Sequence, residues 1–362
     1  MTPRINSIRR ALLLSGAAAL APWPNAASAL TAKKLAFPRD RGAHPDFNTE
    51  WWYITGSVAA GARQFGFQLT FFRSRVASTQ NLTSKFAAKQ LMFAHAAVTD
   101  VEGKKLHHDQ RIARAGFGVA VASEQDMALK LRDWSLRAKG KNYAAEINAQ
   151  DFGLQLELNE TQNVLLQGTQ GLSRKGPLPA QASYYYSQPQ LQVAAVLQLK
   201  GGKPQNLSGK AWLDHEWSQE IMHPEAVGWD WIGMNLFDGS SLTAFQLRKK
   251  DGSALWTGGS FRGQADSALS FTNGQATFAA LPGEQHRFRS PKTNAVYPTD
   301  WALRTPQGNF TVHALFPNQE LDSARSTQTV YWEGLSELRD AQGQTLGRGY
   351  LEMTGYDKPI RL

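Results

Sequence analysis

The sequence has no cysteine, and this absence excludes several kinds of site. Disulfide bonds, thiolate metal ligands and lipid-modified cysteines cannot form in such a chain. No apolar run after residue 30 is long enough to cross a bilayer as a helix. Neither a Walker phosphate loop nor a dinucleotide-binding fingerprint is present. We therefore expect a protein with no cofactor, no metal site and no integral membrane segment.

Acidic residues are in mild deficit, with 39 Lys and Arg against 30 Asp and Glu, for a net charge of +9. The positive excess is spread along the chain, and no basic stripe interleaved with aromatic residues occurs. Such stripes are typical of surfaces that bind nucleic acids. We therefore expect no nucleic-acid partner.

The first 29 residues are typical of a bacterial export signal. Arg9 and Arg10 precede a short apolar run, residues 11–21, and small residues at 27–29 match a cleavage site. We expect cleavage after residue 29 and a periplasmic location for the remaining chain. The paired arginines admit the twin-arginine route. Because no Lys follows the apolar run, the general secretory route is equally open.

Alternation of apolar and polar residues dominates the rest of the chain and predicts half-buried strands. The clearest runs are residues 64–71, 129–136, 154–158 and 190–193. Pairs such as Asp238-Gly239 and Asn273-Gly274 are turn signals between such runs. No long amphipathic helical pattern interrupts the series. The sequence therefore predicts an all-β fold of barrels or sandwiches.

A faint internal repeat suggests two halves. Trp52 and Trp231 stand in similar aromatic segments 179 positions apart, about half of the chain without its signal. A stretch rich in Gly and Pro, residues 168–179, lies between them as a linker would. The predicted organisation is a signal peptide (1–29), an N-terminal domain (30–180) and a C-terminal domain (181–362).

Three short segments combine large aromatic residues with ionisable ones. They are residues 50–53, 212–217 and 229–231, and they hold six of the eleven tryptophans. Tryptophan fills the cores and ends of barrels well, so a purely structural role is one interpretation. The accompanying carboxylates favour a functional one, because Asp and Glu are seldom buried unless they are paired.

In the segment 212–217, strand geometry would place Asp214 and Glu216 on one face and His215 with Trp217 on the other. Two carboxylates at this spacing lie about 7 Å apart, and one can raise the pKa of the other when both are shielded from water. A carboxylic acid kept neutral in this way could protonate a substrate. His215 would then suit a proton shuttle or a polar anchor. Salt bridges at the surface are the alternative interpretation for the two acids.

The arrangement of several blocks resembles the AttH and carotenoid 1,2-hydratase (hydroxyneurosporene synthase) family of lipocalin-like proteins, also described as predicted secreted hydrolases. The blocks are residues 44–53, 183–187, 209–218 and 228–236, with 331–334 and 349–352 near the end. They occur in order over nearly all of the chain after the signal. The resemblance implies two tandem lipocalin-like (calycin) β-barrel domains.

In its carotenoid hydratase members, the family adds water to a terminal isoprenoid double bond without a cofactor. His215 and Trp217 match the His-x-Trp pair of these members. Their Tyr-x-Asp acid has no counterpart in residues 242–247, which contain neither a tyrosine nor an acid. The chain therefore resembles the AttH branch, whose members are associated with transport of lipophilic cargo.

We expect an exported protein that binds a lipid, isoprenoid or similar hydrophobic molecule in an aromatic cavity, as an accessory to envelope transport with an ABC-type system. The alternative is a cofactor-independent hydratase, cyclase or hydrolase. Its candidate catalytic residues are Asp214, His215, Glu216 and Glu50. The candidate ligand contacts are Trp51, Trp52, Tyr53, Trp217, Trp229, Trp231, Gln68 and Gln246. We expect Trp52, Trp217 and Trp231 to line one shared apolar pocket.

Overall fold

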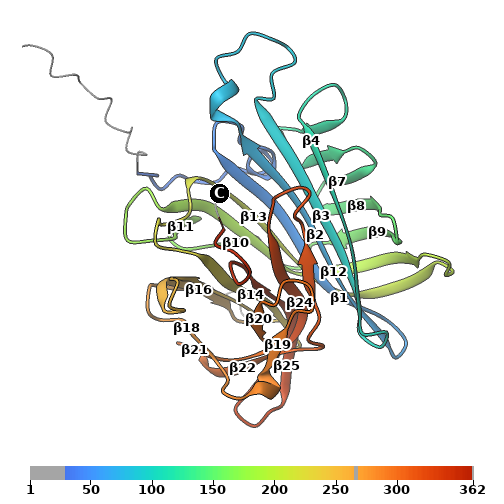
Figure 1. The fold of residues 1–362 in the computed structure, drawn as a ribbon, viewed down its shortest axis with the longest axis vertical. Coiled ribbons are helices and arrows are strands. Elements are labelled where there is room, and N and C mark those ends of the chain that lie inside the picture. The colour runs from blue at the N-terminus through green and yellow to red at the C-terminus, as the bar shows by residue number, and fades with distance from the viewer. Residues whose placement is uncertain (1–28, 265–267, 361–362) are drawn as a thin grey trace, which may run out of the picture.

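The computed structural model describes residues 29–264 and 268–360, and strands make up most of these ranges (Figure 1). The helical elements described are three short 3-10 turns, η1 (Arg39–Arg41), η2 (Ala77–Thr79) and η3 (Glu284–His286). In these ranges no helix has the length and apolar character needed to cross a membrane. Residues 1–28, which hold nearly all of the predicted signal peptide, lie outside the described part.

The first sheet has thirteen strands and curves into a nearly closed barrel (Figure 1). Its strands are β1 (Thr49–Ala60), β2 (Arg63–Arg75), β3 (Gln90–Asp100), β4 (Lys105–Arg114), β5 (Ala120–Ala122), β6 (Ala128–Leu131), β7 (Trp134–Lys139), β8 (Asn142–Asn148), β9 (Phe152–Asn159), β10 (Leu165–Leu166), β11 (Leu172–Arg174), β12 (Ala182–Leu199) and β13 (Gln205–Glu220). The order is β4-β3-β2-β1-β13-β12-β9-β8-β7-β6-β5, with β10 and β11 paired to β12. The first strand is therefore hydrogen-bonded to the last.

The second sheet has ten strands and repeats this arrangement. Its strands are β14 (Gly228–Leu236), β15 (Ser241–Arg248), β16 (Ala254–Arg262), β17 (Ala268–Phe271), β18 (Thr277–Ala280), β21 (Asp300–Thr305), β22 (Gly308–Ala314), β23 (Glu320–Asp322), β24 (Val330–Arg339) and β25 (Thr345–Met353). The order is β17-β16-β15-β14-β25-β24-β22-β21-β18, so the first strand again pairs with the last. The strands β19 (Arg287–Arg289) and β20 (Val296–Pro298) form a separate ribbon.

The predicted fold class, two tandem lipocalin-like β-barrel domains, is confirmed. Alternation produces the strands as expected: in β9, Leu154, Leu156 and Leu158 are buried while Gln155 and Glu157 are exposed. The predicted turns also form. Gly239 and Gly274 both have positive φ angles, of 89° and 85°, which glycine adopts without the steric cost that a Cβ imposes.

The run 129–136, which predicts one strand, is instead a hairpin. Leu131 pairs with Trp134 across a turn in which Arg132 has a φ of 58°. Because both members of this pair are buried, the buried positions change from odd to even numbers at the turn. A two-residue turn shifts the alternation by one residue in this way. The change of the apolar positions from odd to even residue numbers indicates the turn in the sequence.

Each sheet encloses its own apolar core, and a third apolar cluster lies between the sheets. The first core contains Trp52 and Trp217, and the second contains Trp332. The cluster between the sheets contains Tyr53 and Trp231. Trp52 and Trp231 therefore do not occupy equivalent places, although their similarity indicated the repeat. The repeat is expressed in the shared order of the strands.

The change from one sheet to the other lies between Glu220 and Gly228. The domain boundary predicted at residue 180 does not coincide with it, because β12 and β13 still belong to the first sheet. The predicted linker, residues 168–179, is also part of the contact between the sheets. Trp256 of the second sheet donates a hydrogen bond from its indole Nε1 to the Arg174 carbonyl oxygen, at 3.0 Å.

Candidate functional site

The candidate residues lie mainly on β1 and β13, which are neighbours in the first sheet. Tyr53 pairs with Asp214, and Trp52 with His215, in the antiparallel register. Successive side chains on a strand point to opposite faces. Two groups result: one points into the first barrel, and the other points toward the second sheet.

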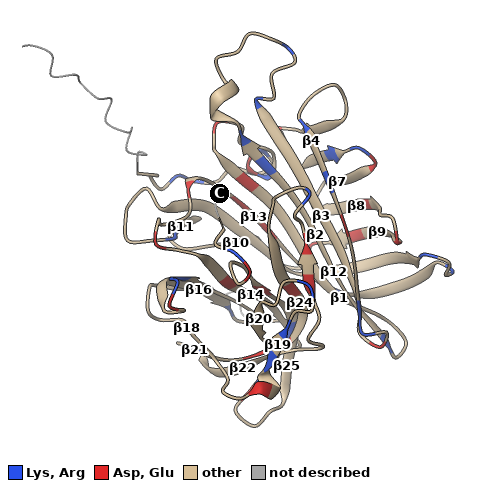
Figure 2. Cartoon of the chain, in the orientation of Figure 1, with Lys and Arg blue, Asp and Glu red and all other residues tan. Residues whose placement is uncertain are grey.

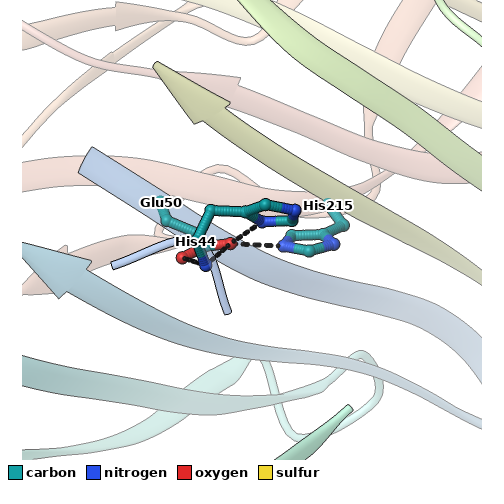
Figure 3. Close-up of side chains that lie close together, drawn as sticks. All are labelled: His44, Glu50 and His215. Carbon is teal, nitrogen blue, oxygen red and sulfur yellow. Dashed lines mark hydrogen bonds and ion pairs between the residues drawn. The ribbon is translucent and has the colours of Figure 1, made fainter. Parts of the chain in front are cut away.

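The group inside the first barrel is centred on Glu50 (Figure 3). Glu50 Oε1 lies 2.7 Å from His44 Nδ1 and 2.9 Å from His215 Nε2. Glu50 Oε2 accepts hydrogen bonds from Arg73 Nε at 2.7 Å and from the His44 backbone N–H at 2.9 Å. On its far side, His44 Nε2 lies 3.0 Å from Asp40 Oδ1. The carboxylate is thus surrounded by hydrogen-bond donors.

Two tryptophans stack on the histidines of this group. The His44 ring lies parallel to Trp217 with centroids 3.8 Å apart, and the His215 ring stacks on Trp52 with centroids 4.6 Å apart. Glu50, His215, Trp52 and Trp217 are each at most 1% exposed. These contacts and the burial account for the four residues as a support for the fold. Catalytic roles for Glu50 and His215 stay predictions.

The charges in this group follow from its contacts. Burial by itself would raise the pKa of Glu50, but hydrogen bonds from His215 and His44 outweigh it and hold that pKa well below the usual range. Burial lowers the pKa of His215 to about 4, although Glu50 acts against it. At neutral pH, an ionised Glu50 is therefore paired with Arg73 and hydrogen-bonded to a neutral His215.

His44, Glu50 and His215 are also residue types that bind metal ions, and their ligand atoms lie within 4.8 Å of one another. Ligand atoms of a tetrahedral zinc stand roughly 3.3 Å apart, since each lies about 2.0–2.1 Å from the ion. Here His44 Nδ1 and His215 Nε2 are within hydrogen-bond distance of the Glu50 carboxylate, at 2.7 and 2.9 Å. This set is closed by its own hydrogen bonds and does not fit an ion without rearrangement.

The second group of residues faces a cavity of about 580 Å³ between the two sheets, here called the inter-sheet cavity. Its walls come from β1, β2, β3 and β13 on one side and from β14, β15, β24 and β25 on the other. The aromatic part of the wall includes Trp51, Tyr53, Phe72, Trp229, Trp231 and Phe245. The cavity is thus large and predominantly apolar, with a few polar groups.

Asp214 is one of these polar groups, and its carboxylate is fully hydrogen-bonded. Oδ2 accepts a hydrogen bond from the Tyr185 hydroxyl at 2.7 Å, and Oδ1 accepts from Ser187 at 2.5 Å and from the Trp212 indole at 2.7 Å. All three donors are neutral. Burial raises the pKa of Asp214 to about 7, although hydrogen bonds from Ser187 and Tyr185 favour the ionised form.

Glu216 forms a buried ion pair in the wall of the cavity. Its Oε1 lies 2.9 Å from Lys175 Nζ and also accepts a hydrogen bond from the Ser183 hydroxyl. The Lys175 ammonium lies over the rings of Phe245 and Tyr185, with Nζ 4.2 and 4.6 Å from the centroids. A buried ammonium with aromatic faces around it gains cation–π attraction besides its ion pair.

A pair of acids on the opposite wall was not predicted from the sequence. Glu333 and Glu352 are register partners on β24 and β25, and both line the cavity. Glu333 is 2% exposed, and its Oε1 has no hydrogen-bond partner among the described residues. Burial, and next the nearby Glu352 carboxyl, raise the pKa of Glu333 well above its ordinary range. Burial also raises the pKa of Glu352.

A local signal for this pair existed. In β24, Tyr331 and Glu333 alternate with core residues, and Tyr350 and Glu352 do the same in β25. These residues belong to the closing blocks 331–334 and 349–352, to which the sequence analysis gave no role. Lys175 was missed because the segment around it was interpreted as a linker.

The predicted common pocket of Trp52, Trp217 and Trp231 is wrong. Trp231 lines the inter-sheet cavity, whereas Trp52 and Trp217 fill the first barrel. The predicted amide contacts also lie elsewhere: Gln68 donates to Thr70 at 2.5 Å, and Gln246 donates to Asp230 at 2.7 Å. Of the predicted residues, the cavity brings together Trp51, Tyr53, Asp214, Glu216, Trp229 and Trp231. Glu50 borders it as well, although its carboxylate is hydrogen-bonded to His44 and His215 inside the first barrel.

Comparison with known proteins agrees with this architecture. The sequence model of the AttH-like family matches residues 28–356. A crystal structure of an AttH candidate from Nitrosomonas europaea is 43% identical, with a TM-score of 0.83, over 91% of this chain and 100% of that one. Kievitone hydratase from Nectria haematococca shares the fold at 13% identity and a TM-score of 0.66, over 91% and 98% of the two chains. No curated protein sequence matches this chain significantly.

Proposed function

The chain belongs to the AttH-like family, and we propose that it binds a predominantly apolar small molecule in the inter-sheet cavity. The observation that carries this proposal is the cavity itself. Its volume of about 580 Å³ falls within the roughly 300–1,000 Å³ typical of small-molecule sites. Aromatic walls with a few placed polar groups are also typical of such sites.

The polar groups suggest the chemistry of the ligand. Lys175 and the tyrosine hydroxyls could donate hydrogen bonds to an oxygen atom, while the aromatic walls would cover a hydrocarbon body. A lipid or isoprenoid with one oxygen-bearing end fits this division. The signal-like N-terminus supports a periplasmic location, and an ABC-type transport system in the envelope is the partner we propose.

Binding can be tested with N-phenyl-1-naphthylamine, a neutral probe whose emission rises in apolar surroundings. Trp51→Ala removes one wall of the cavity and should weaken probe binding about tenfold, as expected for lost burial of a large apolar side chain. Trp256→Ala is the matched control, because Trp256 is also partly buried between the sheets but does not line the cavity. Equal weakening by both variants, or none by either, would place the ligand elsewhere.

A second function, proton transfer to the bound molecule, is favoured by Glu333. A carboxylic acid that stays neutral in an apolar cavity can protonate an alkene carbon. Neighbouring aromatic faces, such as Trp231, would stabilise the resulting cation. Water then adds to the cation, and its released proton returns to the carboxylate. The net reaction is hydration of a double bond without a cofactor.

The test of this second function incubates the protein with geranylgeraniol and looks by mass spectrometry for addition of one water. Glu333→Gln keeps the shape but cannot donate the carboxylic proton, so product should disappear while the probe still binds. Glu146→Gln, at an exposed position on β8, is the control. Undiminished hydration by Glu333→Gln would exclude Glu333 as the acid, and absence of product from the unaltered protein would leave binding as the function.

A further inference from the structure

Two loops at one end of the first sheet present apolar side chains to solvent. The loop 76–89 joins β2 to β3, and the loop 115–119 joins β4 to β5; both lie at the top of Figure 1. Phe86 is 73% exposed and Phe117 is 61% exposed. Leu82 and Val119, in the same two loops, are exposed as well. We refer to these two loops as the apolar tip.

The apolar tip is held together by a stack of side chains. The rings of Phe86 and Phe117 are nearly parallel, with centroids 5.6 Å apart. The Arg114 guanidinium lies over both rings, 4.3 Å from the Phe117 centroid and 5.6 Å from that of Phe86. Arg114 also donates a hydrogen bond to the Phe86 carbonyl oxygen at 3.1 Å. The two phenylalanines are thus preorganised side by side in an exposed position.

The charged residues within the two loops of the apolar tip are all cationic. The exposed Asp46 lies near the base of the tip, where the Arg75 backbone N–H donates a hydrogen bond to the Asn48 carbonyl oxygen. No Asp or Glu occurs from residue 51 to residue 99, or from residue 110 to residue 123. Arg75, Lys85, Lys89 and Arg114 lie within or directly beside the two loops in the sequence. Figure 2 shows blue segments at this end of the molecule. Lys85 and Lys89 are exposed. Within the described ranges none of the four forms an ion pair.

The apolar tip adjoins the inter-sheet cavity. Ser74 and Leu91, which stand at the two ends of the loop 76–89, both line the cavity. Ile112 lines it too and is 39% exposed, which marks an opening at this end. Arg114 follows Ile112 by two residues on the same strand, so the two side chains share one face. The stacked phenylalanines therefore lie next to the mouth of the cavity.

We propose that the apolar tip docks the protein onto the surface of an anionic lipid bilayer. Phe86 and Phe117 enter the boundary between headgroups and acyl chains, where exposed aromatic side chains lose contact with water. The surrounding Lys and Arg residues lie among the headgroups, and each is attracted by the negative surface potential. Docking in this orientation brings the mouth of the cavity to the membrane. The docking itself does not depend on the identity of the cavity ligand.

The test is co-sedimentation of the purified protein with vesicles. Vesicles of equal parts phosphatidylglycerol and phosphatidylethanolamine should bind it at low salt, and phosphatidylcholine vesicles should bind it much less. The double variant Phe86→Ser/Phe117→Ser should lose about tenfold or more in partitioning. Lys85→Gln/Lys89→Gln should weaken binding to the anionic vesicles and reduce its dependence on salt.

Phe237→Ser is the matched control, since Phe237 is 65% exposed in the turn between β14 and β15 and should not contribute. Binding of N-phenyl-1-naphthylamine and the melting temperature are also measured for each variant without vesicles. These measurements distinguish a loss of membrane docking from a loss of ligand binding or of stability. The proposal is overturned if the unaltered protein does not bind anionic vesicles. It is also overturned if Phe237→Ser reduces vesicle binding as much as the double variant does.

Discussion

Asp214 and His215 are neighbours in the sequence but face two different environments. The Asp214 carboxylate faces the inter-sheet cavity and is bonded to Tyr185, whereas the His215 ring lies inside the first barrel and is bonded to Glu50. The distribution of protons at neutral pH follows from this separation. Burial raises the pKa of Asp214 to about 7, so this carboxyl keeps its proton up to near-neutral pH, and burial lowers the pKa of His215 to about 4, so the imidazole is neutral. Asp214, although adjacent to His215 in the sequence, therefore cannot share a proton with it directly.

The Asp214→Asn variant should gain stability relative to the unaltered protein as the pH rises. The folded state holds the Asp214 proton up to about pH 7, whereas the unfolded chain releases it near pH 4. Between these values the folded state binds more protons, so stability is lost as the pH rises, by roughly 1.4 kcal/mol per pH unit. The variant lacks this loss. The melting temperature of Asp214→Asn minus that of the unaltered protein should therefore increase from pH 5 to pH 8.

Asp46→Asn, at an exposed position, is the control and should show no such trend. A difference for Asp214→Asn that does not change with pH would mean that Asp214 is ionised throughout.

His95 should give the opposite trend. His95 is fully buried between the Tyr331 and Ser326 hydroxyls, and burial lowers its pKa to about 3. The unfolded chain takes up this proton near pH 6.5, so stability is lost as the pH falls below that value. His95→Gln should be less stable than the unaltered protein at pH 8, and the gap should narrow at pH 5. Thermal unfolding followed by circular dichroism measures this stability difference, with His223→Gln as the control. A difference that widens at acid pH would contradict a lowered pKa for His95.

Glu50→Gln should destabilise the protein strongly. The change removes the negative partner of Arg73 and leaves a buried guanidinium without compensation. Breaking a buried pair by removing one partner costs about 3–5 kcal/mol. Denaturant unfolding should show this loss, while the folded fraction should bind N-phenyl-1-naphthylamine normally. Reduced binding per folded molecule at unchanged stability would instead assign Glu50 to the ligand site.

Trp217→Ala should reduce stability without reducing probe binding. Trp217 fills the first barrel beside His44, so its removal leaves a cavity there that costs about 3–5 kcal/mol. It does not touch the inter-sheet cavity. Comparison of probe titrations for Trp217→Ala and Trp51→Ala, at a temperature where both are folded, checks this. Weaker binding to Trp217→Ala alone would mean that the ligand enters the barrel.

Part of this architecture could be predicted from the sequence because it depends only on local periodicity. Alternation predicts that Asp214 and Glu216 face away from His215 and Trp217, and the structure has this arrangement. The Gly-containing turns and the all-β class follow from equally local signals. The same periodicity failed at residues 129–136, where a two-residue turn interrupts it.

Which faces meet was decided only by the tertiary structure. Lys175 contacts Glu216 because β11 pairs with β12 and β12 pairs with β13. Glu333, on β24 of the second sheet, lines the same cavity as these residues of the first sheet. A period of two tells which residues share a face of a strand, but not which other face covers it. That choice depends on the order of strands in each sheet and on how the two sheets pack. The acid pair, the buried lysine and the separation of Trp52 from Trp231 are therefore properties of the fold, whereas the strands that carry them are properties of the sequence.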